Sequence, residues 1–331
     1  MKANTTASLL LTALLAATPY ASEPYDPLTL PASGAPETTD LTVTDQSRQR
    51  DIPIRVYLPA DQTPAPVILF SHGLGGSRNA CTYLGKHWSA RGYVAVFLQH
   101  PGSDDSVWRN EPRSKRMAAM NQAASGKNFI LRVHDVPAVL DQLAKWNAES
   151  EHALNGRLDL KHVGMSGHSF GAVTTQSVSG QAARLVGQKF TDNRIRAAIA
   201  FSPSSPRRGD AATAFGSVTI PWMLMTGTKD TAPIGNADVA SRLNVYPNLP
   251  NTIDKYEVLF HNAAHSAFSD RGSPRDKEVR NPNHHRAILA LSTAFWDTHL
   301  RNDNAARQWL QGPGPPSILD EQDRWQTNTP R

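Results

Sequence analysis

The stretch from Gly167 to Gly171 reads Gly-His-Ser-Phe-Gly and constrains the fold more than any other part of the sequence. A short apolar strand pattern runs into it from His162, and a helical pattern leaves it at Ala172. A serine on a sharp strand-to-helix turn projects its hydroxyl away from the backbone, and flanking glycines permit such a turn. The new helix also points its positive end toward that hydroxyl. An ordinary Gly/Ser turn rarely has a strand directly before it and a helix directly after it. We therefore interpret Ser169 as a nucleophile.

The N-terminus has the pattern of a secretory signal peptide. Lys2 supplies a positive charge, and residues 8–17 form an apolar stretch that is too short to span a bilayer. Small residues follow, so we predict that residues 1–21 are removed and that the protein is secreted or periplasmic. The alternative is an apolar N-terminus without this role. No other stretch is apolar enough for a membrane helix, so no integral membrane segment is expected in the mature chain.

Composition indicates a globular enzyme-sized chain. Hydrophobic residues make up 39% and charged residues 19% of 331 residues, and the formal net charge is +5. The basic residues form no long block, so a nucleic-acid partner is not expected. One cysteine, Cys81, excludes an intrachain disulfide, and we interpret it as a packed small residue. We expect a single catalytic domain over residues 22–331, and a monomer.

The rest of the chain alternates strand patterns with helix patterns. Short apolar or alternating segments predict strands, and longer segments with helical periodicity predict helices. This alternation indicates an α/β fold with a mostly parallel central sheet and helices on both faces. The predicted strands are 41–44, 52–58, 66–70, 93–98, the strand from 162 into the glycine motif, 197–201, 222–225 and 256–260; the predicted helices are 80–90, 128–147 and 286–300.

A glycine-rich turn over residues 71–76 follows one of the apolar strands. A dinucleotide-binding fingerprint would need its third glycine at Arg78, so that alternative fails. A turn of this kind leaves backbone N–H groups unpaired, as an oxyanion hole requires. We therefore predict the N–H groups of Leu74 and Phe170 as the two donors. His72 is interpreted as shaping the loop through hydrogen bonds rather than as a base.

A serine nucleophile needs a base, and the base needs an acid to orient it. In this strand–turn–helix arrangement the chain order is serine, acid, histidine. Asp230 lies just past an apolar segment, and two histidines, His261 and His265, follow the next one. We favour His265 because small neighbouring residues leave it room. The predicted triad is therefore Ser169, Asp230 and His265.

Three stretches resemble the α/β-hydrolase superfamily, in the branch shared by bacterial dienelactone-hydrolase-like proteins and platelet-activating-factor acetylhydrolases. They are FSHGLGG at 70–76, GHSFGA at 167–172, and His-x-x-Phe-x-Asp at 265–270. Similarity is spread over residues 50–300. The resemblance implies Ser169 as nucleophile, His265 as base, and Leu74 and Phe170 at the oxyanion hole.

One departure from the acetylhydrolases concerns the acid. The acetylhydrolases carry it just after the strand that follows the nucleophile, but here that strand ends in Ala-Phe-Ser-Pro at 200–203. The segment 227–233 is instead similar to the acid loop of dienelactone hydrolases and bacterial cutinases, which implies Asp230. The difference argues against carrying over the acetylhydrolase specificity.

These features predict a secreted serine esterase that cleaves small-molecule esters of short to medium acyl chains, with polymeric esters as a further candidate. One alternative is a lactone or amide hydrolase with the same triad. Another is a non-catalytic binding protein of the same fold, against which the intact triad argues. No metal and no organic cofactor are expected, because the sequence has no Cys pair, no His-Glu-x-x-His and no phosphate loop.

Residues 101–126 form the longest irregular stretch and are a candidate lid or insertion over the site. Its basic residues either meet an anionic group of the substrate or are simply solvated. Residues 312–331 are expected to form a surface tail that Trp325 anchors. The basic residues are Arg109, Arg113, Lys115 and Arg116, and the candidate substrate-binding residues are His72, Gly73, Trp108 and Phe268.

Overall fold

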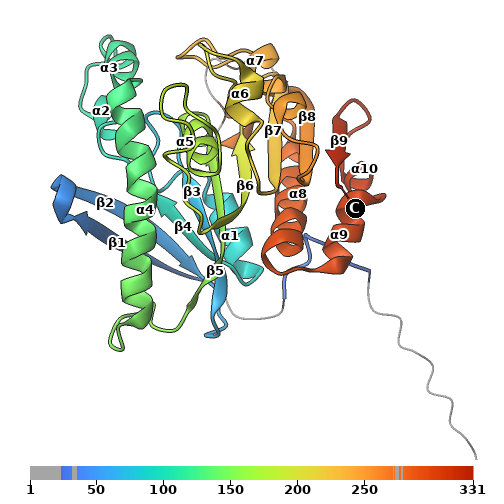
Figure 1. Cartoon of the computed structure of the whole chain (residues 1–331), viewed down its shortest axis with the longest axis horizontal. Helices are drawn as coiled ribbons and strands as arrows, with labels where there is room; N and C mark the ends of the chain where they lie inside the picture. Colours follow the sequence, from blue (N-terminus) through green and yellow to red (C-terminus); the bar gives the residue numbers. More distant parts are fainter. Residues whose placement is uncertain (1–23, 32–35, 271, 273–275, 277–278, 331) are drawn as a thin grey trace, which may run out of the picture.

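A computed structural model describes residues 24–31, 36–270, 272, 276 and 279–330. The predicted signal peptide, residues 1–21, lies outside these ranges. The central feature of the described chain is one sheet, and the helices pack on its two faces (Figure 1).

Among the described residues the sheet has nine strands in the order β1-β2-β4-β3-β5-β6-β7-β8-β9. The six strands from β4 to β8 in this order are parallel, and β1, β2 and β9 add antiparallel pairs at the two edges. The strands are β1 (Glu37–Asp45), β2 (Arg50–Leu58), β3 (Ala65–Ser71), β4 (Val94–Leu98), β5 (Leu158–His168), β6 (Ile195–Phe201), β7 (Trp222–Lys229), β8 (Lys255–Ala264) and β9 (Arg324–Asn328). The predicted α/β fold with a mostly parallel sheet is confirmed.

The period-two alternation of strand side chains divides the core between the two faces of the sheet. In β3, Ile68 and Phe70 pack with α1 and α8, whereas Val67 and Leu69 pack with α4. Burial on both faces explains the continuous apolar runs in β3 and β4. Helix α5 contacts β5 and β6, so it lies directly behind the end of the strand that leads into the glycine motif.

Helices fill the connections between the parallel strands. Two of them, α2 and α3, lie within residues 101–126, for which the sequence pattern predicted no regular structure. The helices are α1 (Thr82–Ala90), α2 (Ser106–Arg109), α3 (Arg116–Ala123), α4 (Gly126–Ala148), α5 (Phe170–Val178), α6 (Ala211–Phe215), α7 (Val239–Leu243), α8 (Pro282–Leu300), α9 (Asn304–Gln311) and α10 (Gly314–Ile318), with single turns at η1 (Gln46–Arg48), η2 (Tyr246–Asn248) and η3 (His265–Phe268).

The segment from 312 to 330 contributes regular structure. It contains α10 and the edge strand β9, which pairs antiparallel with β8. Trp325 stacks on Tyr256 of β8 with a ring-centroid distance of 5.9 Å. The stretch expected to be a tail over the surface therefore closes one edge of the sheet.

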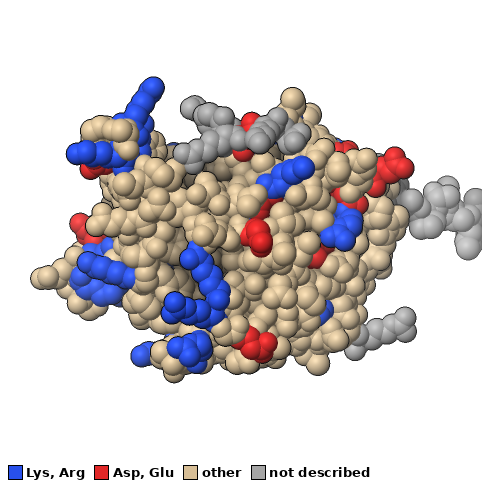
Figure 2. Space-filling view, turned by 90° about the horizontal axis from the view of Figure 1, so that it is seen from above, with Lys and Arg blue, Asp and Glu red and all other residues tan. Residues whose placement is uncertain are grey.

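The carboxyl ends of the parallel strands lie beneath α2, α3, α6 and α7, at the top of Figure 1. Figure 2 views this side and shows basic side chains at several separate places rather than in one continuous patch. In the described ranges no helix has both the length and the apolar character needed to cross a membrane. Parallel α/β sheets carry their sites at the carboxyl ends of the strands, so this is where a site is sought.

Candidate active site

Ser169 occupies the sharp turn between β5 and α5. Its φ of 58° and ψ of −115° are unusual for a residue with a side chain. The turn also needs its two glycines: a Cβ on Gly167 would lie 2.4 Å from the Gly171 carbonyl oxygen, and one on Gly171 would lie 1.8 Å from the Ser71 carbonyl oxygen. The backbone thus holds a strained serine at the carboxyl edge of the sheet, as a nucleophile elbow does.

The structure brings the three residues of the predicted triad together in one hydrogen-bonded chain. The Ser169 hydroxyl lies 2.9 Å from Nε2 of His265, and Nδ1 of His265 lies 2.6 Å from Oδ1 of Asp230. In the arrangement that satisfies both contacts, Ser169 donates to Nε2 and Nδ1–H donates to the carboxylate. His261 instead lies within β8, where its backbone N–H donates to Asp323. The geometry supports the choice of His265 as the base.

Asp230 follows β7 and is fully buried. Burial favours the neutral acid and by itself raises the pKa of Asp230, but contacts with His265, Arg242 and Ser202 outweigh this and hold the pKa at about 2. The hydroxyls of Ser202 and Thr226 donate to Oδ2 at 2.7 and 2.9 Å. Ser202 stands just after β6, where acetylhydrolases carry their acid, and here it supports the acid of the next strand.

Arg242 on α7 was not foreseen from the sequence. Its side chain is 1% exposed, and its Nε donates to the backbone carbonyl of Asp230 at 2.7 Å and lies 3.0 Å from Oδ1 of that residue. A second nitrogen donates to the carbonyls of Ser202 and Pro203 at 2.8 and 2.9 Å. Arg242 therefore joins the loops that follow β6 and β7. Nothing in its local sequence marks it, because its partners lie in other loops.

His168 immediately precedes Ser169 and contacts both the backbone and the ring of the predicted base, His265. Its Nε2 donates to the His265 carbonyl at 3.0 Å, and the two rings are 4.7 Å apart. Burial, together with the neighbouring His265, lowers the pKa of His168 to about 3, so this ring stays neutral. The sequence contained one signal for this residue, its position inside the glycine motif.

The two predicted oxyanion-hole donors face the same space as Ser169. Leu74 lies in the loop after β3 and Phe170 is the first residue of α5, and both line the cleft that Ser169 lines. Among the described residues neither backbone N–H donates to a protein acceptor. Two free N–H groups beside a serine hydroxyl are suited to hold an anionic oxygen, and the N-terminus of α5 adds to the positive potential there.

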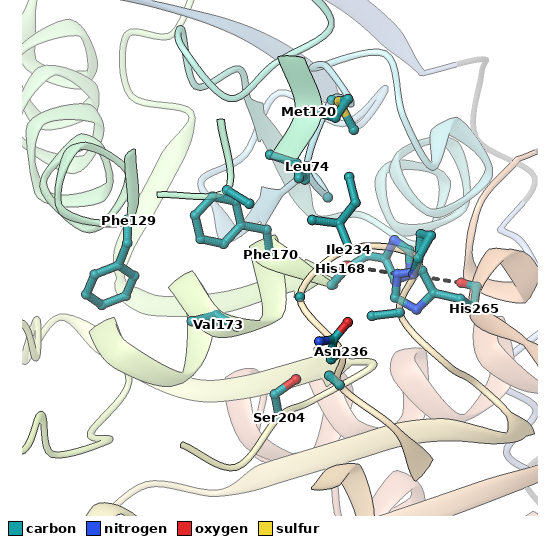
Figure 3. A pocket seen from close by; sticks show the side chains of 18 of the residues that line it. Leu74, Met120, Phe129, His168, Phe170, Val173, Ser204, Ile234, Asn236 and His265 are labelled. Carbon is teal, nitrogen blue, oxygen red and sulfur yellow. Dashed lines mark hydrogen bonds between the residues drawn. The ribbon is translucent and has the colours of Figure 1, made fainter. Parts of the chain in front are cut away.

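The cleft over Ser169 has a volume of about 1010 Å³. Figure 3 shows Phe129, Phe170 and Val173 on one side, and His168 and His265 on the other. Figure 3 also shows Ile234 between the two sides, with Asn236 and Ser204 below them. The cleft therefore has an apolar side built from α4 and α5, a facing side with His168 from the end of β5 and His265 from after β8, and polar residues from the loops after β6 and β7 below them.

Of the four predicted substrate-binding residues, Gly73 lines the cleft, and the side chains of the other three make contacts elsewhere. His72 is fully buried beneath the loop, where it contacts the carbonyl of Gly73 at 2.6 Å and accepts from the N–H of His100 at 3.1 Å. Trp108 donates to the Gly75 carbonyl at 2.8 Å and anchors the loop after β4. Phe268 is buried behind His168, with a ring-centroid distance of 5.8 Å.

The stretch 101–126 meets the cleft through uncharged residues. Met120, Asn121 and Ala124 line the cleft, whereas the four basic residues singled out above do not. Arg109 pairs with Asp105, the residue before its helix, and the Arg116 guanidinium lies 5.3 Å from the centroid of the Trp108 ring. These contacts favour a structural or solvated role for the basic residues over contact with an anionic substrate.

A second Ser-His-Asp arrangement lies behind the loop after β3. The Ser71 hydroxyl is 2.9 Å from Nε2 of His100, and Nδ1 of His100 is 2.8 Å from Asp135. All three residues are fully buried, and burial lowers the pKa of His100 to about 4. Since no substrate reaches Ser71, this chain of hydrogen bonds is a support for the loop rather than a second site.

The described residues contain no cluster of three or more His, Cys, Asp or Glu side chains arranged to hold a metal. Cys81 lines the cleft but is buried, its Sγ contacts the Phe268 carbonyl at 3.2 Å, and burial raises the pKa of its thiol. A thiol that stays protonated is a poor nucleophile, which leaves Ser169 as the residue suited to attack.

The sheet order, the strained serine turn and the cleft at the carboxyl edge identify the fold of an α/β hydrolase. Residues 56–125 match the family model described as platelet-activating factor acetylhydrolase, isoform II. The resemblance to this branch is confirmed over that stretch, and it implies a serine-esterase type of hydrolase. The stretch includes the loop with Leu74 and ends before Ser169. No curated protein matches the chain at a significant level.

Proposed function

We propose that this protein hydrolyses carboxylic esters, with Ser169 as nucleophile, His265 as general base and Asp230 as the orienting acid. The observation that carries the proposal is the continuous hydrogen-bonded chain of these three residues, at 2.9 and 2.6 Å, opening onto a large cleft. A buried Ser-His-Asp chain without access, such as that of Ser71, lacks the second property.

The proposed reaction proceeds through an acyl-enzyme. Nε2 of His265 takes the proton of Ser169 as the hydroxyl oxygen attacks the ester carbonyl carbon, and the N–H groups of Leu74 and Phe170 hold the resulting oxyanion. His265 then gives the proton to the leaving alcohol as the C–O bond breaks. Water, deprotonated by His265, attacks the acyl carbon and releases the acid. Asp230 stays ionised and stabilises the imidazolium, consistent with its low pKa.

The size and lining of the cleft support the proposal that the substrates include esters larger than an acetyl ester. Its volume of about 1010 Å³ lies at the upper end of the range for small-molecule sites, roughly 300–1,000 Å³. The apolar side, with Phe129, Phe170 and Val173, suits an acyl chain. We further propose that the protein acts outside the cytoplasm, on the basis of the apolar N-terminal stretch in its sequence.

The test is hydrolysis of p-nitrophenyl acetate, butyrate and octanoate by the purified protein beside Ser169→Ala. We expect turnover of all three esters, and a loss of several orders of magnitude in kcat for the variant. Full activity in Ser169→Ala would reject the proposed nucleophile. Turnover of a lactone or an anilide without turnover of any ester would favour the lactone or amide alternative.

A further inference from the structure

The two proposed oxyanion donors come from separate parts of the chain. Leu74 belongs to the loop after β3, and Phe170 begins α5 after β5. Both N–H groups must point at one oxygen atom, and a misplacement of about 1 Å in such a site costs roughly 100-fold in rate. Something must therefore hold the loop and the helix in a fixed relation.

Arg132 of α4 contacts both parts. One terminal nitrogen donates to the hydroxyl of Ser71, the last residue of β3, at 3.0 Å and to the carbonyl of His72, the first residue of the Leu74 loop. Its Nε donates to the Thr174 hydroxyl on α5 at 3.1 Å. The guanidinium also lies over the Phe170 ring, 4.6 Å from its centroid.

The same side chain reaches the loop after β4, which supports the Leu74 loop from its other side. The remaining terminal nitrogen of Arg132 donates to the Ser103 hydroxyl at 2.9 Å. Ser103 in turn accepts the Gly75 N–H at its carbonyl at 2.8 Å. One planar group thus joins three segments around the oxyanion hole, which a flexible ammonium could not do with the same geometry.

The electrostatic setting of Arg132 is unusual for a structural residue. The side chain is fully buried, and Asp135 on the same helix pairs instead with Arg50 and His100. Burial lowers the pKa of Arg132 to about 9, although Asp135 and Asp104 offset part of this, so the group stays charged at neutral pH. Burying a cation that is hydrogen-bonded only to neutral oxygens costs desolvation free energy. This cost favours a role for Arg132 beyond packing.

We propose that Arg132 is a positioning residue that fixes the N–H groups of Leu74 and Phe170 relative to each other, an inference that rests on the proposed ester hydrolysis. Arg132 touches neither substrate nor reacting atoms. It acts by holding the two donors where the oxyanion of the tetrahedral intermediate forms, so its loss weakens binding of the transition state more than binding of the ester.

The test compares Arg132→Lys and Arg132→Met with Arg157→Lys. Arg157 is a buried arginine that donates to the carbonyls of Pro59 and Asp61 at 2.8 and 3.2 Å, beside the first residue of β5 and far from its Ser169 end. For each protein, kcat and KM are measured with p-nitrophenyl butyrate. The inhibition constant of butylboronic acid, which forms a tetrahedral adduct with a serine, is measured in parallel. Circular dichroism and Tm report the fold.

We expect Arg132→Lys to lower kcat roughly 10- to 100-fold, to change KM less than about threefold, and to weaken boronate binding by about the same factor as kcat. Arg157→Lys is expected to lower Tm and leave kcat within about twofold. The proposal is overturned by an unchanged kcat in folded Arg132→Lys, by a fall in kcat without weaker boronate binding, or by an equal fall in kcat in Arg157→Lys.

If neither Arg132 variant folds, Thr174→Val removes the α5 contact alone. We then expect a fall in kcat of several-fold that Thr174→Ser restores, because serine keeps the accepting hydroxyl. Wild-type kcat in Thr174→Val would overturn the positioning role. Absence of Ser169-dependent turnover in the wild-type protein would instead refute the proposed function itself, and the positioning role with it.

Discussion

Substitution of Gly171 by alanine tests whether the serine turn depends on a close approach of two backbones. The added Cβ would lie 1.8 Å from the Ser71 carbonyl oxygen and 2.9 Å from the His72 carbonyl oxygen, where ordinary contact begins at 3.4 Å. Helix α5 and the end of β3 would therefore have to separate by about 1.6 Å. Neither contacting atom belongs to a side chain, so no change of rotamer relieves the clash.

The expected cost follows from that displacement. Overpacking a well-packed core typically costs about 1–3 kcal/mol, and a clash between backbones belongs at or above the top of this range. The same movement separates Leu74 from Phe170, and a shift of about 1 Å is enough for a loss of roughly 100-fold in rate. We thus expect Gly171→Ala to lower the free energy of unfolding by about 3 kcal/mol or more and kcat by at least about 100-fold.

Urea denaturation and p-nitrophenyl butyrate hydrolysis measure the two effects, with the stability of Gly126→Ala as the matched control. An alanine Cβ at Gly126, the first residue of α4, would meet no atom within 4 Å. That variant is expected to be unchanged or up to about 1 kcal/mol more stable. A Gly171→Ala protein within about 0.5 kcal/mol of the wild type and with unchanged kcat would refute the steric reasoning.

Three further predictions concern buried charges. Because folding lowers the pKa of Asp230 to about 2, its ionised carboxylate contributes about 2 kcal/mol of stability, which is present above pH 4 and lost as the pH falls through 2. Asp230→Asn should therefore remove this acid dependence in urea titrations and lower kcat about 10⁴-fold. Arg242→Met removes the buried cation that pairs with Asp230 and should cost about 3–5 kcal/mol in the same titrations, a loss below about 1 kcal/mol being contrary to the reasoning. Burial raises the pKa of Glu257 to about 7, so its stabilising neutral form is lost as the pH rises through 7. Glu257→Gln should therefore match the wild-type Tm at pH 5 and exceed it at pH 8, and equal differences at both pH values would contradict this.

The main elements of the fold were predictable because each leaves a local signal. The apolar run at 66–70 becomes β3, and the long amphipathic stretch at 128–147 becomes most of α4. The edge strand β9 has none of these signals, because its residues are mostly exposed and its position depends on pairing with β8. A strand that is determined by its partner cannot be identified from its own sequence.

The same distinction applies to the site. Ser169, Asp230 and His265 each follow an apolar strand, so their spacing indicated that they meet. Arg132 and Arg242 contact residues that lie 12 to 61 positions away in the sequence, and no periodic pattern reports such contacts. His72 and Phe268 lie close to site residues in sequence, but their side chains are buried, and the local sequence does not report which way a side chain points.

The outer edge of β8 stays unpaired during synthesis until β9 has been made. His265 follows β8, whose outer edge pairs with residues 324–328. The ribosome synthesises β8 and the proposed base before it synthesises β9. Until then the sheet has an open edge next to the site, which other chains can join. The nascent chain therefore carries an unpaired β8 edge from the synthesis of β8 until β9 is made, and pairing with β9 removes it.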